Sequence, residues 1–112
     1  MIAIARLAAL SGALAVIAGA FGAHGAVGEA QQWLKTGGEY QMVHAVAAFA
    51  ARAYPRSAAL MLAGSVLFAA TLYAMALGAP RWLGAVTPLG GVGMIAGWCC
   101  LALSYNARKA GH

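Results

Sequence analysis

Four long apolar runs, with most of the charged residues between or after them, constrain this chain more than any other feature. They cover residues 2–21, 39–54, 57–77 and 83–105. Hydrophobic residues make up 63% of the chain and charged residues 8%, more apolar surface than a water-soluble domain could bury. A helix of about 20 residues is about 30 Å long, which matches the hydrocarbon core of a bilayer. We therefore expect one all-α domain, residues 1–112, folded as an integral membrane four-helix bundle.

The first run is predicted to cross the membrane as a helix. Ser11, Ala15, Gly19 and Ala23 recur at every fourth position, and such small residues let another helix approach closely. A secretory signal peptide is the competing interpretation, because Arg6 precedes an apolar stretch that ends in small residues. The apolar residues before Arg6 disfavour it, since a basic region belongs there.

The polar connection over residues 24–38 predicts either a short interfacial helix between the first two spans or a plain surface loop. Apolar residues 27, 30 and 34 fall on one helical face, with Trp33 at the depth of the lipid headgroups. Gly37 and Gly38 are expected to end this helix. The run that follows is only about 24 Å long as a helix, so we expect that span to be the one most surrounded by protein.

Small residues and a proline mark the places where the later helices are expected to begin or to pack. Pro88 either opens the last membrane helix, with Thr87 as its cap, or kinks a longer one. We prefer the opening, because residues 88–105 still reach about 27 Å. Four glycines are expected to serve as helix-packing positions: Gly19, Gly22, Gly93 and Gly97. The last two form a GxxxG pair, a weak motif that usually indicates close packing.

The placement of Lys and Arg predicts the orientation of the chain. With four spans, one side receives Arg6, Arg52, Arg56, Arg108 and Lys109, and the other receives Lys35 and Arg81. The positive-inside rule then predicts a multi-pass protein of the cell inner membrane with both termini in the cytoplasm. The net charge of +5 comes from scattered residues, so we expect no nucleic-acid partner. The expected partners are membrane lipids and a larger membrane protein complex, and the sequence leaves the oligomeric state open.

Four motifs in order resemble the YgdD-type family of small inner-membrane proteins of unknown function. They are Gly-Ala-Phe-Gly-Ala-His-Gly at 19–25, Tyr-Gln-Met-Val-His-Ala at 40–45, Leu-Tyr at 72–73 with Ala-Leu-Gly at 76–78, and Leu-Gly-Ala-Val-Thr-Pro-Leu-Gly-Gly at 83–91 followed by Gly97-Trp98. The family tends to carry Ser-Gly-Ser before the Leu-Tyr pair, where this chain has Ala69-Ala70-Thr71 and keeps one hydroxyl. The resemblance implies a four-helix membrane protein and brings no established activity.

The stretch from Tyr40 to His44 places an amide and an imidazole inside an apolar segment. Ionisable groups at membrane depth are costly, so they mark functional candidates. The candidate polar cluster, in the outer half of the bundle, contains His24, Glu39, Gln41, His44, Thr71 and Tyr73. We expect His44 to pair with Gln41, or with Thr71 or Tyr73 of the third helix, and the two histidines could face each other. The competing interpretation is that His44 is a neutral imidazole that bonds two helices together.

The sequence gives little support for a metal site, a haem site or a cysteine-based site. A metal or haem site would use His24 and His44 with Glu29 or Glu39, but the spacing matches no known site, so we expect no metal and no cofactor. The adjacent Cys99 and Cys100 fit neither a disulfide framework nor a zinc pair.

No serine, cysteine or acid cluster comes with a base at workable spacing, so we expect that the protein is not an enzyme. The leading interpretation is a non-enzymatic accessory or interaction subunit of a membrane complex. The alternative is a small transporter or channel that uses the polar cluster, although Glu39 lies only at the edge of the membrane.

Overall fold

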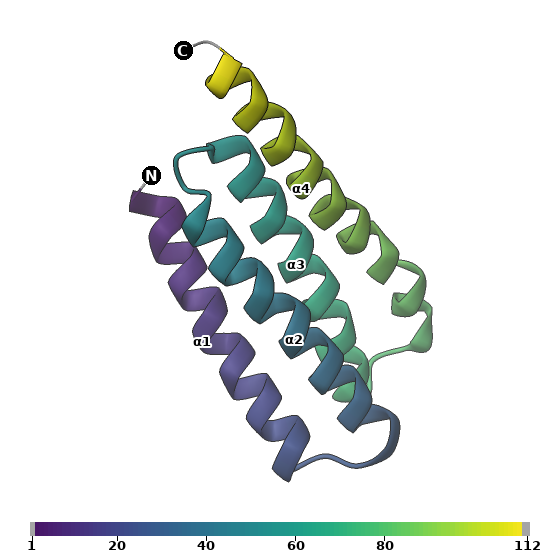
Figure 1. The fold of residues 1–112 in the computed structure, drawn as a ribbon. Helices are drawn as coiled ribbons and strands as arrows, with labels where there is room; N and C mark the ends of the chain where they lie inside the picture. The colour runs from purple at the N-terminus through teal and green to yellow at the C-terminus, as the bar shows by residue number, and fades with distance from the viewer. Residues whose placement is uncertain (1, 111–112) are drawn as a thin grey trace.

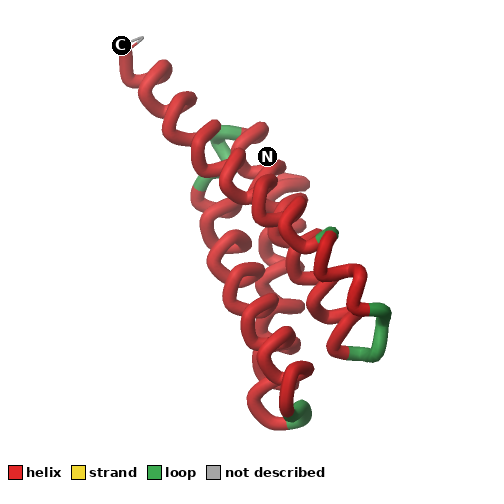
Figure 2. Tube along the Cα trace, turned by 90° about the vertical axis from the view of Figure 1, so that its right-hand side faces the viewer, coloured by secondary structure: helices red, strands yellow, loops and turns green. Residues whose placement is uncertain are grey.

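The computed structural model describes residues 2–110 and consists there of helices and connections, without strands. The elements are α1 (Ile2–His24), α2 (Gly28–Ala50), α3 (Pro55–Ala76), the 3-10 helix η1 (Arg81–Ala85) and α4 (Thr87–Ala110). The long helices alternate in direction, so the start of α1 and the end of α4 lie at the same end of the molecule (Figure 1). In the view turned by 90°, the last turns of α4 extend beyond the other helices (Figure 2). We call the end that holds both termini the terminal end.

Three segments within the described residues are long and apolar enough to cross a membrane: α1, α3 and the stretch Arg81–Ala107. Helix α2 is not among them, because its first half carries Glu29, Lys35 and Glu39. The extensive contacts join α1 to α2, α2 to α3 and α3 to α4, with a smaller contact between α1 and α3. Helices that are neighbours in sequence are therefore neighbours in space.

Helix α2 corrects the prediction of a separate interfacial helix, because it runs without a break through Gly37 and Gly38. A glycine that ends a helix adopts positive φ, and only Gly28 and Gly78 do so in the described chain. Gly37 and Gly38 serve packing instead. A Cβ added to Gly37 would lie 2.7 Å from Tyr73 Cε1, and one added to Gly38 would lie 3.2 Å from the Ala15 carbonyl oxygen.

Helix α3, in contrast to α2 at Gly37 and Gly38, is terminated by a glycine. Gly78 has φ 105°, its N–H donates to the Met75 carbonyl (3.0 Å), and the Ala79 N–H donates to the Ala74 carbonyl (2.9 Å). These two bonds form a Schellman motif, which satisfies carbonyls that the helix end leaves free.

The centre of the molecule is α3 rather than α2, contrary to the expectation from span length. Ten residues of α3 are buried, against seven of α2. The α3–α4 contact explains the difference, because glycines bring the two backbones together. A Cβ on Gly64 would lie 2.6 Å from the Met94 nitrogen, and one on Gly97 would lie 2.8 Å from Met61 Cγ. Met61 is completely buried.

Small residues also form the buried stripe of α1, which contains Ala8, Ser11, Ala15, Ala18 and Gly22. The predicted four-residue repeat is correct for Ser11 and Ala15, but Ala23 is exposed and Gly22 takes its place. A helix has 3.6 residues per turn, so a strict repeat of four drifts off the contact face. A Cβ on Gly22 would lie 3.0 Å from Leu34 Cβ of α2, and Gly19 lies against Gly38.

Helix α4 begins at Thr87 and continues unbroken to Ala110, with Pro88 as its second residue. Proline is tolerated in a first turn, where its missing N–H has no partner in the helix. Pro88 therefore opens α4 and does not kink it.

Candidate functional site

Gln41 is the centre of a buried hydrogen-bond network that joins three helices. Its side chain is 2% exposed. Gln41 Nε2 donates to Ser11 Oγ of α1 at 3.0 Å, and Gln41 Oε1 accepts from the Tyr73 hydroxyl of α3 at 2.6 Å. Both ends of the amide are thus used, and each fixes the position of a different neighbouring helix.

The local sequence explains why Tyr73 can reach Gln41. Gly37 lies one turn before Gln41 on the same face of α2, and the Tyr73 ring occupies the space that a side chain at Gly37 would fill. Gln41, His44 and Ala48 recur at helical spacing and are all buried. These three residues lie on the interior face of α2, whereas Arg52, four positions after Ala48, is exposed.

His44 joins α2 to α4 through Trp98. The imidazole Nε2 lies 2.9 Å from Trp98 Nε1, and Nδ1 lies 2.7 Å from the Tyr40 carbonyl oxygen. An indole N–H can only donate and a carbonyl oxygen can only accept. His44 therefore accepts at Nε2 and donates from Nδ1, which defines a neutral imidazole with its proton on Nδ1. The Trp98 ring meets the imidazole edge-on, with ring centroids 5.8 Å apart.

A second pair of polar side chains joins α3 to α4. The Thr71 and Thr87 hydroxyl oxygens are 2.6 Å apart, and Thr71 also donates to the Phe68 carbonyl at 2.9 Å. Thr87 donating to Thr71, and Thr71 to Phe68, uses each hydroxyl proton once. Thr87, predicted as a helix cap, carries an interhelical contact.

His24 and Glu39 lie outside this network. His24 is the last residue of α1 and is exposed, and Glu39 is exposed on α2. At the level of His44, the residue of α1 that faces α2 is Gly12, next to Ala45. The helix from Gly12 to His24 is about 18 Å long.

The expectation that His24 and His44 could face each other is therefore wrong, and the two histidines do not share a metal or haem site. Among the described residues, no group of three His, Cys, Asp or Glu side chains is placed to hold a metal ion.

Sequence reasoning missed three partners in the network and one surface ion pair. Ser11, Trp98 and Thr87 bond to predicted cluster residues, but their helices offer no spacing signal that would identify the pairs. Glu29 forms an ion pair with Arg81, whose guanidinium lies 5.7 Å from the centre of the Trp33 ring. This pair connects the start of α2 to η1. Both side chains are largely exposed, so the pair adds little stability.

The network can hold four helices in register, but it offers no free acid or base. Gln41, His44, Thr71 and Tyr73 all have hydrogen-bond partners on other elements. Among the described residues, the buried side-chain nitrogen or oxygen atom without a partner is Ser57 Oγ, which lies near the terminal end. The geometry of the network is therefore that of interhelical attachment.

Comparison with known proteins places these helices among proteins that are named for the membrane. The family described as "Protein of unknown function (DUF423)" matches residues 18–91. The UPF0382 membrane protein of Haemophilus influenzae is 39% identical over 116 residues, which cover 93% of this chain and 92% of that protein. The UPF0382 inner membrane protein YgdD of Escherichia coli is 40% identical over 109 residues, covering 84% and 82%. YwdK, a UPF0382 membrane protein of Bacillus subtilis, is 37% identical over 113 residues, covering 88% and 91%. No solved structure matches the chain.

Proposed function

Since this chain belongs to the DUF423 (UPF0382) family of membrane proteins, we propose that all four of its long helices cross the inner membrane and that both termini lie in the cytoplasm. Three helices are apolar enough to span without help. Helix α2 has 23 residues, about 35 Å in all, and it packs against α1 on one side and α3 on the other. Its polar first half then reaches the outer headgroups, and its buried amide and imidazole are covered by protein.

The distribution of charge supports this orientation. Arg6, Arg52 and Arg56 lie toward the terminal end, whereas Glu29 and Glu39 are in the first half of α2, toward the opposite end. Lys35 and Arg81 share that opposite end with the two acids, so its formal charge is zero. A surplus of Lys and Arg marks the cytoplasmic side.

The activity that the geometry supports best is binding of other membrane proteins, as a non-enzymatic accessory or interaction subunit. One observation carries this proposal: the side chains of the Gln41, His44, Thr71 and Tyr73 network bond within the chain, while the outward faces of α1 and α4 are apolar. Leu14 and Ile17 of α1, and Val92 and Ile95 of α4, are all more than half exposed. These apolar faces are what the protein presents to its surroundings in the membrane.

Photocrosslinking in native membranes tests this proposal. A benzoyl-phenylalanine would be placed at Ile17 in one variant and at Ile95 in another, since both side chains are 64% exposed. A subunit occupies one place in a complex, so we expect one position to yield a defined protein adduct and the matched position on the other helix to yield none. Adducts with lipid alone, from both positions, would contradict an accessory role.

A small transporter is the second candidate, favoured by a groove between α1 and α2. This cavity of about 780 Å³ is lined by Gln31, Lys35 and Glu39 next to apolar residues. A carboxylate beside a cavity could exchange a proton for a substrate. Reconstituted vesicles test this role, because Glu39→Gln should abolish any proton-linked flux. A flux equal in the variant and in the native protein would remove Glu39 from the mechanism.

A further inference from the structure

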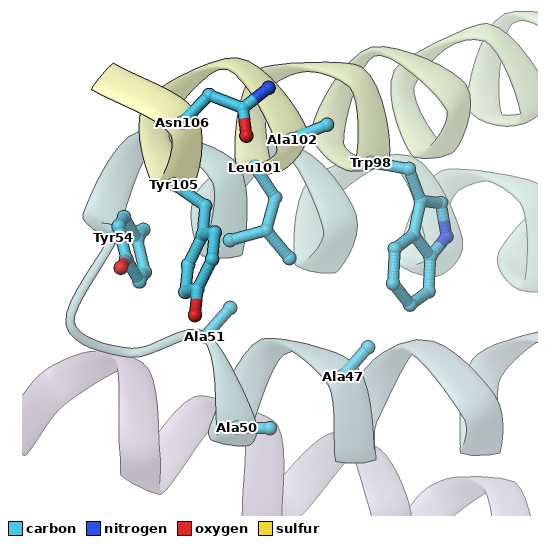
Figure 3. Close-up of a pocket in the computed structure, with 9 residues that line it drawn as sticks. All are labelled: Ala47, Ala50, Ala51, Tyr54, Trp98, Leu101, Ala102, Tyr105 and Asn106. Atoms are coloured by element: carbon cyan, nitrogen blue, oxygen red, sulfur yellow. The ribbon is translucent and has the colours of Figure 1, made fainter. Parts of the chain in front are cut away.

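A groove between α2 and α4 opens near the terminal end of the molecule (Figure 3). Its volume is about 620 Å³. The α2 wall consists of small side chains and the α4 wall of large ones: Ala47, Ala50 and Ala51 face Trp98, Leu101 and Tyr105. Small residues on one wall leave a channel beside the other, and the surface of this channel is apolar along most of its length. An extended hydrocarbon chain fits such a lining.

The groove becomes polar where it reaches the terminal end. Tyr54 and Tyr105 lie there with their ring centroids 6.4 Å apart, and Asn106 also lines the groove. A second cavity, of about 320 Å³, shares Tyr54 with the groove and is lined by Arg56 and Ser57. The two cavities therefore flank one tyrosine, an apolar one toward the middle of the molecule and a polar one at its end.

Ser57 lines this second cavity and carries an unused hydrogen-bond donor. The residue is completely buried, and its hydroxyl has no partner within the part of the chain that the structure describes. A buried hydroxyl without a hydrogen bond is costly, so a ligand or water that accepts from it would be favoured. Arg56 on the same wall adds a positive charge and is exposed.

The positive charge around the polar cavity favours an anionic ligand. The cationic side chains of Arg6, Arg52 and Arg56 lie toward this end, while both carboxylates of the sequence, Glu29 and Glu39, belong to the first half of α2. An anionic group is thus attracted without a competing Asp or Glu side chain at this end. A second copy of the chain in the same orientation would bring its own arginines to this level and would be repelled.

We propose that the groove between α2 and α4 binds one anionic phospholipid. An acyl chain lies between the alanines of α2 and Leu101, and the phosphate lies beside Arg56, in the polar cavity that Ser57 also lines. Tyrosine side chains have one apolar and one polar end, so Tyr54 and Tyr105 suit the boundary between chain and headgroup. The site does not depend on which protein partners the chain has.

Trp98 provides a reporter inside the groove. In a Trp33→Phe, Trp82→Phe background it is the only tryptophan of the chain, and lipids brominated on the acyl chain quench its fluorescence on contact. The purified protein would be reconstituted in phosphatidylcholine vesicles that contain a small fraction of brominated phosphatidylglycerol or of brominated phosphatidylcholine. We expect brominated phosphatidylglycerol to quench Trp98 about fivefold more effectively at equal content, because one cation near the membrane surface contributes about that factor in affinity for anionic lipid. Unlabelled phosphatidylglycerol should reverse the excess.

Two pairs of variants distinguish lipid binding in the groove from general effects of membrane composition on Trp98 quenching. Ala102→Leu, at an exposed position that lines the groove, should remove the excess quenching, whereas Ala13→Leu on an exposed face of α1 should leave it unchanged. Arg56→Gln should also remove it, whereas Arg6→Gln, which removes another cation of the same end, should not.

Equal quenching by the two brominated lipids would overturn the proposal, because it would mean that the groove holds ordinary bilayer lipid. If neither brominated lipid quenches Trp98 and crosslinking in the same vesicles yields dimers, a second copy of the chain occupies the groove. That result would overturn the proposal as well. Far-ultraviolet circular dichroism of each variant checks that the helices are intact.

Discussion

Gln41 is the residue whose side chain ties the most helices together. Its amide donates to Ser11 and accepts from Tyr73, so a single side chain fixes α1 and α3 relative to α2. An unpaired polar group in hydrocarbon has no water to bond, and each of these three groups satisfies another. A change at Gln41 therefore affects two partners at once.

Gln41→Leu should lower the free energy of unfolding by about 1–2 kcal/mol, since it keeps the side-chain size but removes two interhelical hydrogen bonds. Equilibrium unfolding in mixed micelles, followed by tryptophan fluorescence, measures this. Adding Tyr73→Phe should cost less in the Gln41→Leu background than in the native protein, because the shared bond is already lost. The control, Tyr105→Phe, should cost the same in both backgrounds. Full additivity of Gln41→Leu with Tyr73→Phe would show that the bond contributes nothing.

At the scale of single residues, the sequence predicts which way a side chain faces better than it predicts which residue that side chain bonds. The spacing of Gln41 and His44 indicates one helical face, and a short polar pair in an apolar segment has to face protein rather than lipid. The partners of that face depend on how the other helices are rotated about their axes. Trp98 bonds His44 from 54 positions away, and a tryptophan in an apolar run gives no sign of which way it points.

At the scale of elements, glycine decides how closely α3 and α4 approach. Gly64 faces Gly90 and Gly93 across this contact, and the nearest atoms around each are backbone atoms of the other helix. A backbone atom cannot rotate out of the way as a side chain can. Close contact of this kind replaces the hydrophobic driving force that helices lack inside lipid.

Gly90→Ala should therefore destabilise the protein by about 1–3 kcal/mol, the usual cost of overfilling a packed site. The added methyl group would lie 2.5 Å from the Phe68 nitrogen and 2.6 Å from the Gly64 carbonyl oxygen. The adjacent Gly91 is the matched control, because a Cβ there meets nothing within 4 Å. Gly91→Ala should be neutral or stabilise by up to about 1 kcal/mol through helix propensity. Thermal unfolding in detergent compares the two variants, and an equal effect would contradict this account of the α3–α4 contact.

The role of glycine in helix packing also explains why a helix end was wrongly predicted at Gly37 and Gly38. A Gly-Gly pair after a polar stretch is typical of a helix end, yet Gly37 and Gly38 lie in the middle of α2. Whether a glycine ends a helix or receives a neighbour depends on what approaches it, and the Tyr73 ring and the α1 backbone come from distant parts of the sequence. The Gly93 and Gly97 pair has no polar stretch before it, and its packing role could be read directly.

At the scale of the whole molecule, the alternation of four helices places the two termini together. The proposed topology can be tested with single cysteines in a Cys99→Ala, Cys100→Ala background. His24→Cys and Asn106→Cys are both at exposed positions, at opposite ends of the molecule. We expect a membrane-impermeant maleimide to label His24→Cys in intact cells and Asn106→Cys only after permeabilisation. Both should react equally in detergent. Labelling of both from the same side, or in the reverse order, would contradict the orientation.

The separation of His24 from His44 is also a property of the whole molecule. The two helices that carry them run in opposite directions from a tight connection, so distance from that connection sets depth along the molecule (Figure 1). His24 adjoins the connection and His44 is far along α2. The alternation of apolar runs was sufficient to predict this order of helices. Helix α2, however, begins at Gly28, eleven residues before the predicted run at 39–54, and that shift moves the two histidines apart.

The order of the helix contacts has a consequence for biogenesis. Each extensive contact joins a helix to the next one made, so no helix has to wait for a distant segment before it can pack. A nascent chain leaving the ribosome can form the hairpin of α1 and α2 first, closing the bond between Ser11 and Gln41. It can then add α3, whose Tyr73 donates to Gln41 of α2, and finally pack α4 against Gly64 of α3. Local contacts of this kind favour rapid assembly during insertion.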